Sequence, residues 1–372
     1  MFSKKYCLFF AFSCHIGLLS AQNGSLESSF YQGTVWRHSP KLTTQTGEGI
    51  SGFELGYQWQ TTGRQNWEAW QRYPAFGASL SVFTLGEGSH ERAFSLLPHL
   101  SIPLFRAGKW AGHFRVGTGF SWVTKPYDYF SNPTQNALGS HWNNITQFRF
   151  GAQYRLLRAL QLSAGGSMTH FSNGGLSLPN FGINIFSAWV GVSSPLNPAA
   201  NRTFQPATER RKKVARRWGA QWQSGLARLE IASFDGPKHP VWIVSGAGFY
   251  QSSQINRFIV GLDYESNQAI REWGLHSARF RTEAEARRGA SRMALFVADE
   301  ILFGDLSIVL QAGRYLGKER NQYVPKATYA KLSARYYLTF GKQPLIKPFV
   351  GISIKAHKFT AEYISWNLGA SF

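Results

Sequence analysis

Hydrophobic and polar residues alternate along many short segments of this chain. In the segment 329–340, every second residue is apolar: Ala330, Leu332, Ala334, Tyr336, Leu338 and Phe340. Because side chains two residues apart on a strand point to the same face, this period predicts β-strands with one apolar and one polar face. About sixteen such segments can be placed, the first near residues 26–36 and the last at 361–372.

The apolar faces favour a barrel that spans a membrane. Strands of about ten residues that alternate apolar-out and polar-in are typical of outer-membrane barrels. Backbone polar groups cannot stay unpaired in lipid, so such strands must close on each other. The final segment ends on the aromatic Phe372, as terminal strands of these barrels do. We therefore predict an all-β fold, a transmembrane antiparallel outer-membrane β-barrel of about 16 strands. A soluble sandwich with one wet face is the alternative.

The amino-terminal segment has the features of a secretory signal. Lys4 and Lys5 precede an apolar run that is too short to span a membrane and is followed by Ala21. We predict a signal peptide over residues 1–21. Both cysteines lie inside it, so the mature protein is predicted to have no disulfide, thiol catalyst or cysteine metal site. No cluster of histidines and carboxylates suggests a metal, and no cofactor is predicted.

The rest of the chain divides at a long polar connection. Residues 22–195 are predicted to form the N-terminal half of the barrel, and residues 218–372 the C-terminal half with its terminal aromatic strand. Residues 196–217 between them are predicted to be a basic periplasmic linker. This division permits two eight-stranded barrels in tandem, but one larger barrel is the favoured interpretation.

Basic residues outnumber acidic ones. The chain has 40 Lys and Arg against 20 Asp and Glu, a net charge of +20. After a signal peptide, the basic run 210–217 is expected to be part of a solvated linker, so no nucleic-acid partner is predicted. The excess suits an anionic lipid, whose phosphates pair with Lys and Arg. The oligomeric state is left open by the sequence.

A potential hydrolytic site lies at the end of the seventh predicted strand. His170 and Ser172 share its apolar face, which makes a general base and a hydroxyl nucleophile neighbours on the lipid side. The side-chain amide of Asn173 and the backbone at Gly174 are candidate oxyanion donors. Asn184, on the next strand, has the parity to point outward beside His170 and orient its ring.

These residues carry a resemblance to a known family. The motifs 170–174 (His-Phe-Ser-Asn-Gly) and 179–183 (Pro-Asn-Phe-Gly-Ile) resemble the active-site signature of the lipid A 3-O-deacylases. Segments 261–264 and 352–357 resemble the longer relatives described as acyloxyacyl hydrolases. The resemblance implies a Gram-negative outer-membrane esterase that removes an ester-linked acyl chain from lipid A of lipopolysaccharide. By the same resemblance, His170 is the base, Ser172 the nucleophile, and Asn173 with Gly174 the oxyanion donors.

One position departs from the family pattern. The family has a glutamate fourteen residues after the histidine, where this chain has Asn184. An amide can orient an imidazole but cannot stabilise the imidazolium by charge. Three interpretations stay open: a weaker triad, replacement by another acid, or loss of catalysis. A non-enzymatic porin or structural barrel, and a homologue that binds lipopolysaccharide without cleaving it, are the alternative functions.

Overall fold

The computed structural model describes most of the chain. The described residues are 23–44, 49–85, 91–199, 203–208, 217–231, 235–317, 327–340, 345–357 and 360–372. The predicted signal peptide at 1–21 lies outside them, as does most of the predicted basic run 210–217.

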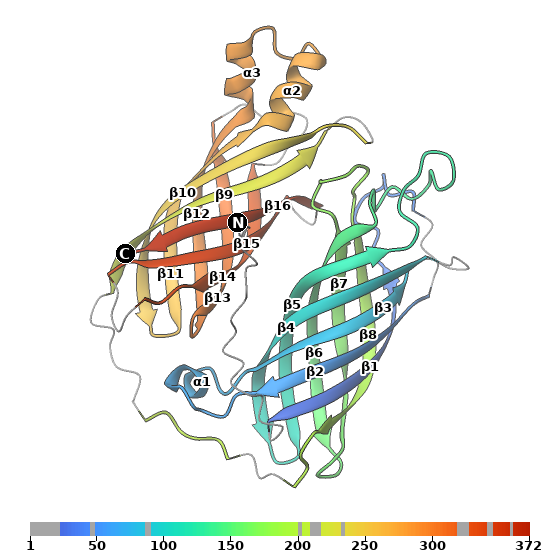
Figure 1. The fold of residues 1–372 in the computed structure, drawn as a ribbon, viewed down its shortest axis with the longest axis vertical. Coiled ribbons are helices and arrows are strands. Elements are labelled where there is room, and N and C mark those ends of the chain that lie inside the picture. The colour runs from blue at the N-terminus through green and yellow to red at the C-terminus, as the bar shows by residue number, and fades with distance from the viewer. Residues whose placement is uncertain are drawn as a thin grey trace, which may run out of the picture.

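The first eight strands close into a barrel, blue to green in Figure 1. Its strands are β1 (Gly24–Val35), β2 (Ile50–Gln60), β3 (Ala75–Thr84), β4 (Arg92–Ala107), β5 (Trp110–Val123), β6 (Trp142–Arg155), β7 (Gln161–Ser172) and β8 (Ile183–Pro195). Closure comes from antiparallel pairing of β1 with β8, from Ser25 opposite Pro195 to Val35 opposite Ile185.

The next eight strands close into a second barrel, yellow to red in Figure 1. Its strands are β9 (Trp218–Glu230), β10 (Lys238–Ser253), β11 (Asn256–Asn267), β12 (Ser291–Phe303), β13 (Leu306–Leu316), β14 (Thr328–Tyr337), β15 (Lys347–His357) and β16 (Thr360–Ser371). Among the described residues, three short helices accompany the barrels: α1 (Asn66–Trp70), α2 (Gln268–His276) and α3 (Glu283–Ala290). No helix in the described part of the chain is long and apolar enough to cross a membrane.

The prediction of an all-β outer-membrane fold with sixteen strands is confirmed, but the preference for one larger barrel is wrong. The alternative of two eight-stranded barrels in tandem is correct. The reason is that β8 pairs with β1 and not with β9, while β9 pairs with β16. Alternation along a strand determines which way its side chains point, but it does not select the strand's distant partner.

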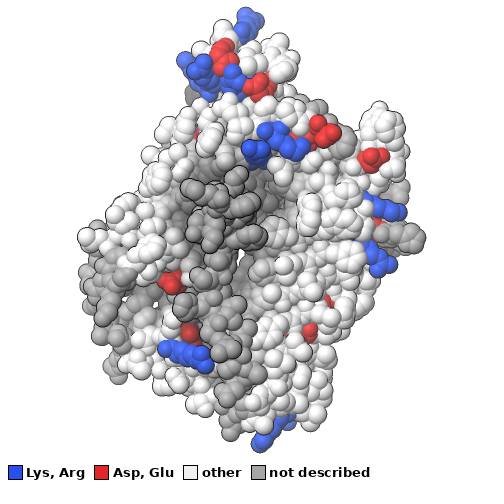
Figure 2. All heavy atoms as spheres, viewed as in Figure 1, with Lys and Arg blue, Asp and Glu red and all other residues white. Residues whose placement is uncertain are grey.

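The outer walls of both barrels are apolar. Exposed side chains such as Leu80, Val190 and Leu368 lie on alternate positions, and buried polar ones lie between them. Figure 2 shows a face that is largely uncharged, with charged side chains gathered at the upper end over α2 and α3. This distribution is that of a barrel surrounded by lipid, and the protein is an outer-membrane barrel.

Charged networks fill the two lumens. In the first barrel, Glu54 pairs with Arg115 at 2.8 Å and with Arg149 at 3.3 Å. In the second, Asp263 pairs with Lys331 at 2.7 Å. The interior of an eight-stranded barrel is just wide enough for side chains to fill. Arg149, Arg335 and Lys355 also lie in the lumens, in ion pairs with carboxylates.

Candidate active site

The predicted pair lies on the outer wall, at the end of β7. The first residue of β7, Gln161, pairs with Ser193 at the end of the barrel where β1 begins, so Ser172 lies at the opposite end. With the termini of an even-stranded barrel in the periplasm, that opposite end is extracellular. The register of β7 with β6 is continuous from Gln161 to Ser172, without a bulge.

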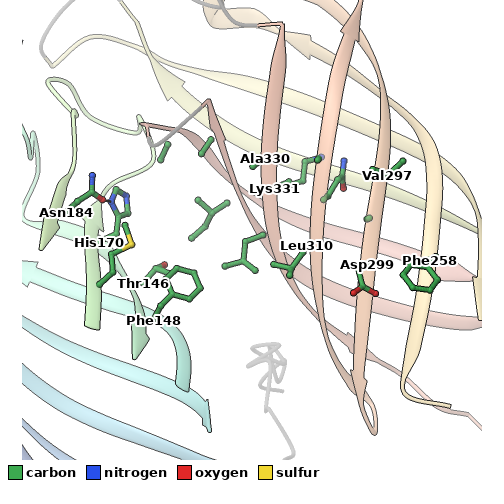
Figure 3. A pocket seen from close by; sticks show the side chains of 18 residues that line it. Thr146, Phe148, His170, Asn184, Phe258, Val297, Asp299, Leu310, Ala330 and Lys331 are labelled. Atoms are coloured by element: carbon green, nitrogen blue, oxygen red, sulfur yellow. Dashed lines mark hydrogen bonds between the residues drawn. The ribbon is translucent and has the colours of Figure 1, made fainter. Parts of the chain in front are cut away.

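His170 points away from the lumen and bonds with Asn184. The two residues lie opposite each other in the β7–β8 ladder, as the strand parity predicts. His170 Nδ1 and Asn184 Oδ1 are 2.7 Å apart. Both side chains border a cavity of about 580 Å³ outside the barrel wall (Figure 3).

A second histidine, His38, continues this network. Asn184 Nδ2 donates to His38 Nδ1 at 3.0 Å, and His38 Nε2 lies 3.0 Å from the carbonyl oxygen of Phe181. A carbonyl can only accept, so His38 Nε2 must carry the proton and His38 Nδ1 must be the acceptor. Asn184 therefore turns its NH₂ group to His38 and its oxygen to His170.

This one-way chain of hydrogen bonds determines the tautomer of His170. Its Nδ1 donates to Asn184 Oδ1, so in the neutral ring Nε2 carries a lone pair. Nε2 is the nitrogen that acts as general base in Ser-His-Asp triads. The arrangement thus leaves an imidazole nitrogen that can accept a proton, with an amide and not a carboxylate orienting the ring.

The Ser172 hydroxyl is held by its own loop. Ser172 is 2% exposed, and its Oγ accepts from Gly174 N at 3.0 Å and from Asn180 Nδ2 at 2.9 Å. Its hydrogen-bond partners among the described residues do not include His170. The structure therefore places the base and the hydroxyl on one face but does not join them by a hydrogen bond.

The loop after β7 brings backbone N–H groups together. Gly174 and Gly175 have φ of 64° and 75°, a left-handed conformation that favours glycine. The N–H of Asn173 donates to Asn180 Oδ1 at 3.1 Å, beside the Gly174 N–H on Ser172. The sequence predicts the Asn173 side-chain amide as an oxyanion donor. In the structure this amide donates to Ser177 O at 2.8 Å and anchors the loop.

Two residues of this network are missing from the sequence prediction. Asn180 lies in the Pro-Asn-Phe-Gly-Ile motif, but the strand pattern assigns it no role. His38 carries no signal in the sequence, because it reaches Asn184 only after β1 and β8 have paired. Within the described residues, no group of three or more His, Cys, Asp or Glu side chains could hold a metal ion.

The fold and this site define an outer-membrane barrel with an outward His–Asn pair and an adjacent buried serine. The family model "Lipid A 3-O-deacylase (PagL)" matches residues 51–193, and "Acyloxyacyl hydrolase, C-terminal domain" matches residues 219–372. The chain belongs to the lipid A 3-O-deacylase family, among its longer, acyloxyacyl-hydrolase-type members. No curated protein matches it.

Solved structures of outer-membrane barrels are similar in part. The crystal structure of the outer membrane enzyme PagL is 17% identical, with a TM-score of 0.32, and covers 44% of this chain and 97% of its own. Neisserial surface protein A is 8% identical, with a TM-score of 0.30, and covers 46% of this chain and 96% of its own. A Rhodopseudomonas blastica porin is 10% identical, with a TM-score of 0.18, and covers 94% of this chain and 100% of its own.

Proposed function

We propose that this protein is an outer-membrane serine esterase that removes an ester-linked acyl chain from lipid A of lipopolysaccharide. The observation that carries the proposal is the outward placement of His170 beside Ser172 on one strand face, at the extracellular end of a lipid-facing wall. Family membership supports the same chemistry. A substrate whose ester lies at the outer membrane surface can reach this position without leaving the membrane.

In the proposed reaction Ser172 is the nucleophile. Its side chain turns from Asn180 toward His170 Nε2, and Oγ attacks the ester carbonyl while Nε2 takes the hydroxyl proton. The N–H groups of Asn173 and Gly174 stabilise the tetrahedral oxyanion. Collapse breaks the ester C–O bond, and His170 returns the proton to the departing sugar oxygen. Water, activated by His170, then attacks the acyl-serine and releases the fatty acid and free Ser172.

Asn184 takes the orienting role in this scheme. In a Ser-His-Asp enzyme, replacing the acid by its amide costs roughly 10⁴ in turnover, because the imidazole adopts the wrong tautomer. Here His38 holds the Asn184 oxygen toward His170, which keeps the productive tautomer. The charge stabilisation of the imidazolium is lost, so the proposal corresponds to the weaker triad among the three interpretations.

Two observations bear on the alternative functions. The filled lumens argue against a porin, because charged side chains occupy the interior of each barrel. A homologue that binds lipopolysaccharide without cleaving it is the second candidate. It is favoured by Asn184 in the glutamate position and by the bonds that hold Ser172 to Asn180.

Mass spectrometry of lipid A tests the proposal. Lipid A is extracted from Gram-negative cells expressing the wild type, Ser172→Ala or Ser163→Ala, which alters a serine elsewhere on β7. We expect loss of one acyl chain with the wild type and Ser163→Ala only. Unchanged lipid A in all three strains, with the barrels folded in the outer membrane, rejects the esterase and leaves the binding function.

A further inference from the structure

The cavity beside His170 lies between the two barrels and is lined by both (Figure 3). Its volume of about 580 Å³ falls within the range of roughly 300–1,000 Å³ typical of small-molecule sites. The first barrel contributes residues of β6, β7 and β8: Thr146, Phe148, Met168, His170 and Asn184. The opposite wall belongs to β11–β16 of the second barrel.

The wall from the second barrel is predominantly apolar. Outward side chains of successive strands line it: Phe258, Val297, Leu310, Leu332 and Ile354. Lys331 also borders the cavity, but its ammonium pairs with Asp263 on the lumen side. Asp299 lies near the periplasmic end of β12, and its carboxylate accepts a hydrogen bond from Asn256. Near His170, the wall of the cavity from the second barrel therefore consists of apolar side chains and not of charged groups.

The cavity follows the length of the second barrel. Strands of outer-membrane barrels are tilted by about 35–45°, so a line along the barrel axis crosses one strand after another. The lining residues run from Phe258, near the periplasmic start of β11, to Ala361, near the extracellular start of β16. The cavity thus extends from His170 into the depth of the membrane, the direction in which a lipid acyl chain lies.

Contacts at both ends hold the barrels on either side of this space. At the extracellular end, Glu230 N donates to Gly175 O at 2.9 Å, and the Glu230 carboxylate accepts from the N–H of Leu178. At the periplasmic end, Gln71 Nε2 donates to Leu302 O at 2.9 Å. The middle, with no such bond between the described residues, is where the cavity opens.

We propose that this cavity holds the acyl chain of the ester cleaved at Ser172, with the outer wall of the second barrel forming one side of the site. The inference rests on the proposed esterase function, and it specifies that the protein binds the substrate by its acyl chain. On a single barrel, an acyl chain would contact protein on one side and bulk lipid on the other. Lipid tails are as apolar as leucine, so close packing between two walls, and not hydrophobicity, selects the chain.

The test compares esters that differ only in acyl length. Full-length protein in detergent micelles is given p-nitrophenyl butyrate or p-nitrophenyl myristate. Leu332→Trp and Leu310→Trp fill the cavity from the second barrel. The matched control, Leu262→Trp, makes the same change at an exposed position of β11 outside the cavity.

We expect both cavity variants to lower kcat/KM for the myristate ester by about tenfold, the scale on which an apolar pocket discriminates by size. The butyrate ester, too short to reach the second barrel, should change little, and its hydrolysis shows that the variants are folded. The Leu262→Trp control should change neither rate. Equal effects on both esters, or no effect of either cavity variant, overturn the inference while leaving the esterase intact. A wild type that hydrolyses neither ester rejects the esterase itself.

Discussion

The seventh strand of each barrel carries a histidine at or near its extracellular end, and the two histidines face opposite ways. On β7, His170 points outward to the lipid side and bonds with Asn184. On β15, His357 points into the lumen, 2.9 Å from the Tyr315 hydroxyl and 3.5 Å from Glu362. A shift of one residue along a strand moves a side chain to the other face. The same residue type therefore serves a candidate reaction site in one barrel and an internal polar network in the other.

The two hairpins also differ in the residues that come after the histidine. After His170, the strand continues to Ser172 and a loop with two glycines at positive φ. Beyond His357, the next strand begins at Thr360, and Glu362 lies within the charged network of Lys355 and Arg292. A catalytic function needs outward parity and a loop that presents N–H groups, and among the described residues only the first hairpin combines them.

The largest contrast is expected when the two histidines are removed in turn. His170→Ala should lower kcat by about 10⁴-fold or more, the scale seen when a triad base is deleted. His357→Ala should leave kcat near the wild-type value, while losing the hydrogen bond to Tyr315 and about 1 kcal/mol of stability. Initial rates on lipopolysaccharide micelles and urea unfolding measure the two effects. Equal loss of rate in both variants contradicts the assignment.

His38 gives a second test of this comparison, because it belongs to the hydrogen-bond network of His170 and Asn184 and has no part in the network around His357. His38→Ala should let the Asn184 amide rotate and should cost between about 10² and 10⁴ in kcat, up to the penalty for the wrong tautomer. His38→Gln, which can accept from Asn184 and donate to Phe181, should recover part of the rate.

The Asn184→Glu variant is the control for this role. A carboxylate accepts through both oxygens and needs no neighbour to orient it. Asn184→Glu should match or exceed the wild-type rate, and adding His38→Ala to it should have little further effect. If His38→Ala lowers kcat by the same factor in the wild type and in the Asn184→Glu variant, His38 acts only through packing.

Glu230 tests the contact between the barrels. Glu230→Ala removes the acceptor for Leu178 N and should loosen the loop that carries Gly174, lowering kcat by about 10- to 100-fold through misplaced groups. Its matched control is Lys238→Ala, which removes only the 3.6 Å ion pair on the other side of Glu230. Similar rates for the two variants would show that the second barrel does not support the loop.

The smallest effect is expected at the extracellular end of the first barrel. Burial raises the pKa of Glu91 from its ordinary value of 4.5 to about 7, although Gln135 bonds to its carboxylate. Because the folded pKa is raised, the stabilisation is complete below about pH 4.5 and is lost as pH rises through about 7. The protection of the amides around Gln135 from hydrogen exchange should therefore fall between about pH 5 and 8, with a slope that corresponds to the release of about one proton. Glu91→Gln should abolish that pH dependence, and a persistent one would assign it to another group.

Much of this fold can be predicted from alternation alone. The period-two pattern places Leu332 outward and Lys331 inward, and it predicts the number of strands. It could not predict closure at β8, because the pairing of Ser25 with Pro195 joins residues far apart in the chain. Both one barrel and two barrels satisfy the same alternation, and only the pairing of strand edges separates them.

The sequence likewise predicts some contacts of the candidate site and not others. Parity within one hairpin places Asn184 beside His170. The contact of His38 with Asn184 cannot be predicted from the sequence, because it forms only when β1 pairs with β8 and closes the barrel. Next to His38, Trp36 N bonds to Asn184 O at 2.8 Å. The partner of Ser172 was also missed, since Asn180 meets it through the irregular loop 173–182, whose path no strand pattern describes.

Covalent labelling of the serine tests the central claim most directly. Wild-type protein in micelles is treated with a long-chain alkyl fluorophosphonate, and the modified residue is located by peptide mass spectrometry. We predict one adduct on Ser172, absent in Ser172→Ala, strongly slowed in His170→Ala and unaffected in His357→Ala. An adduct on a different residue, or none on a folded wild-type protein, would contradict a nucleophilic serine on the lipid-facing wall.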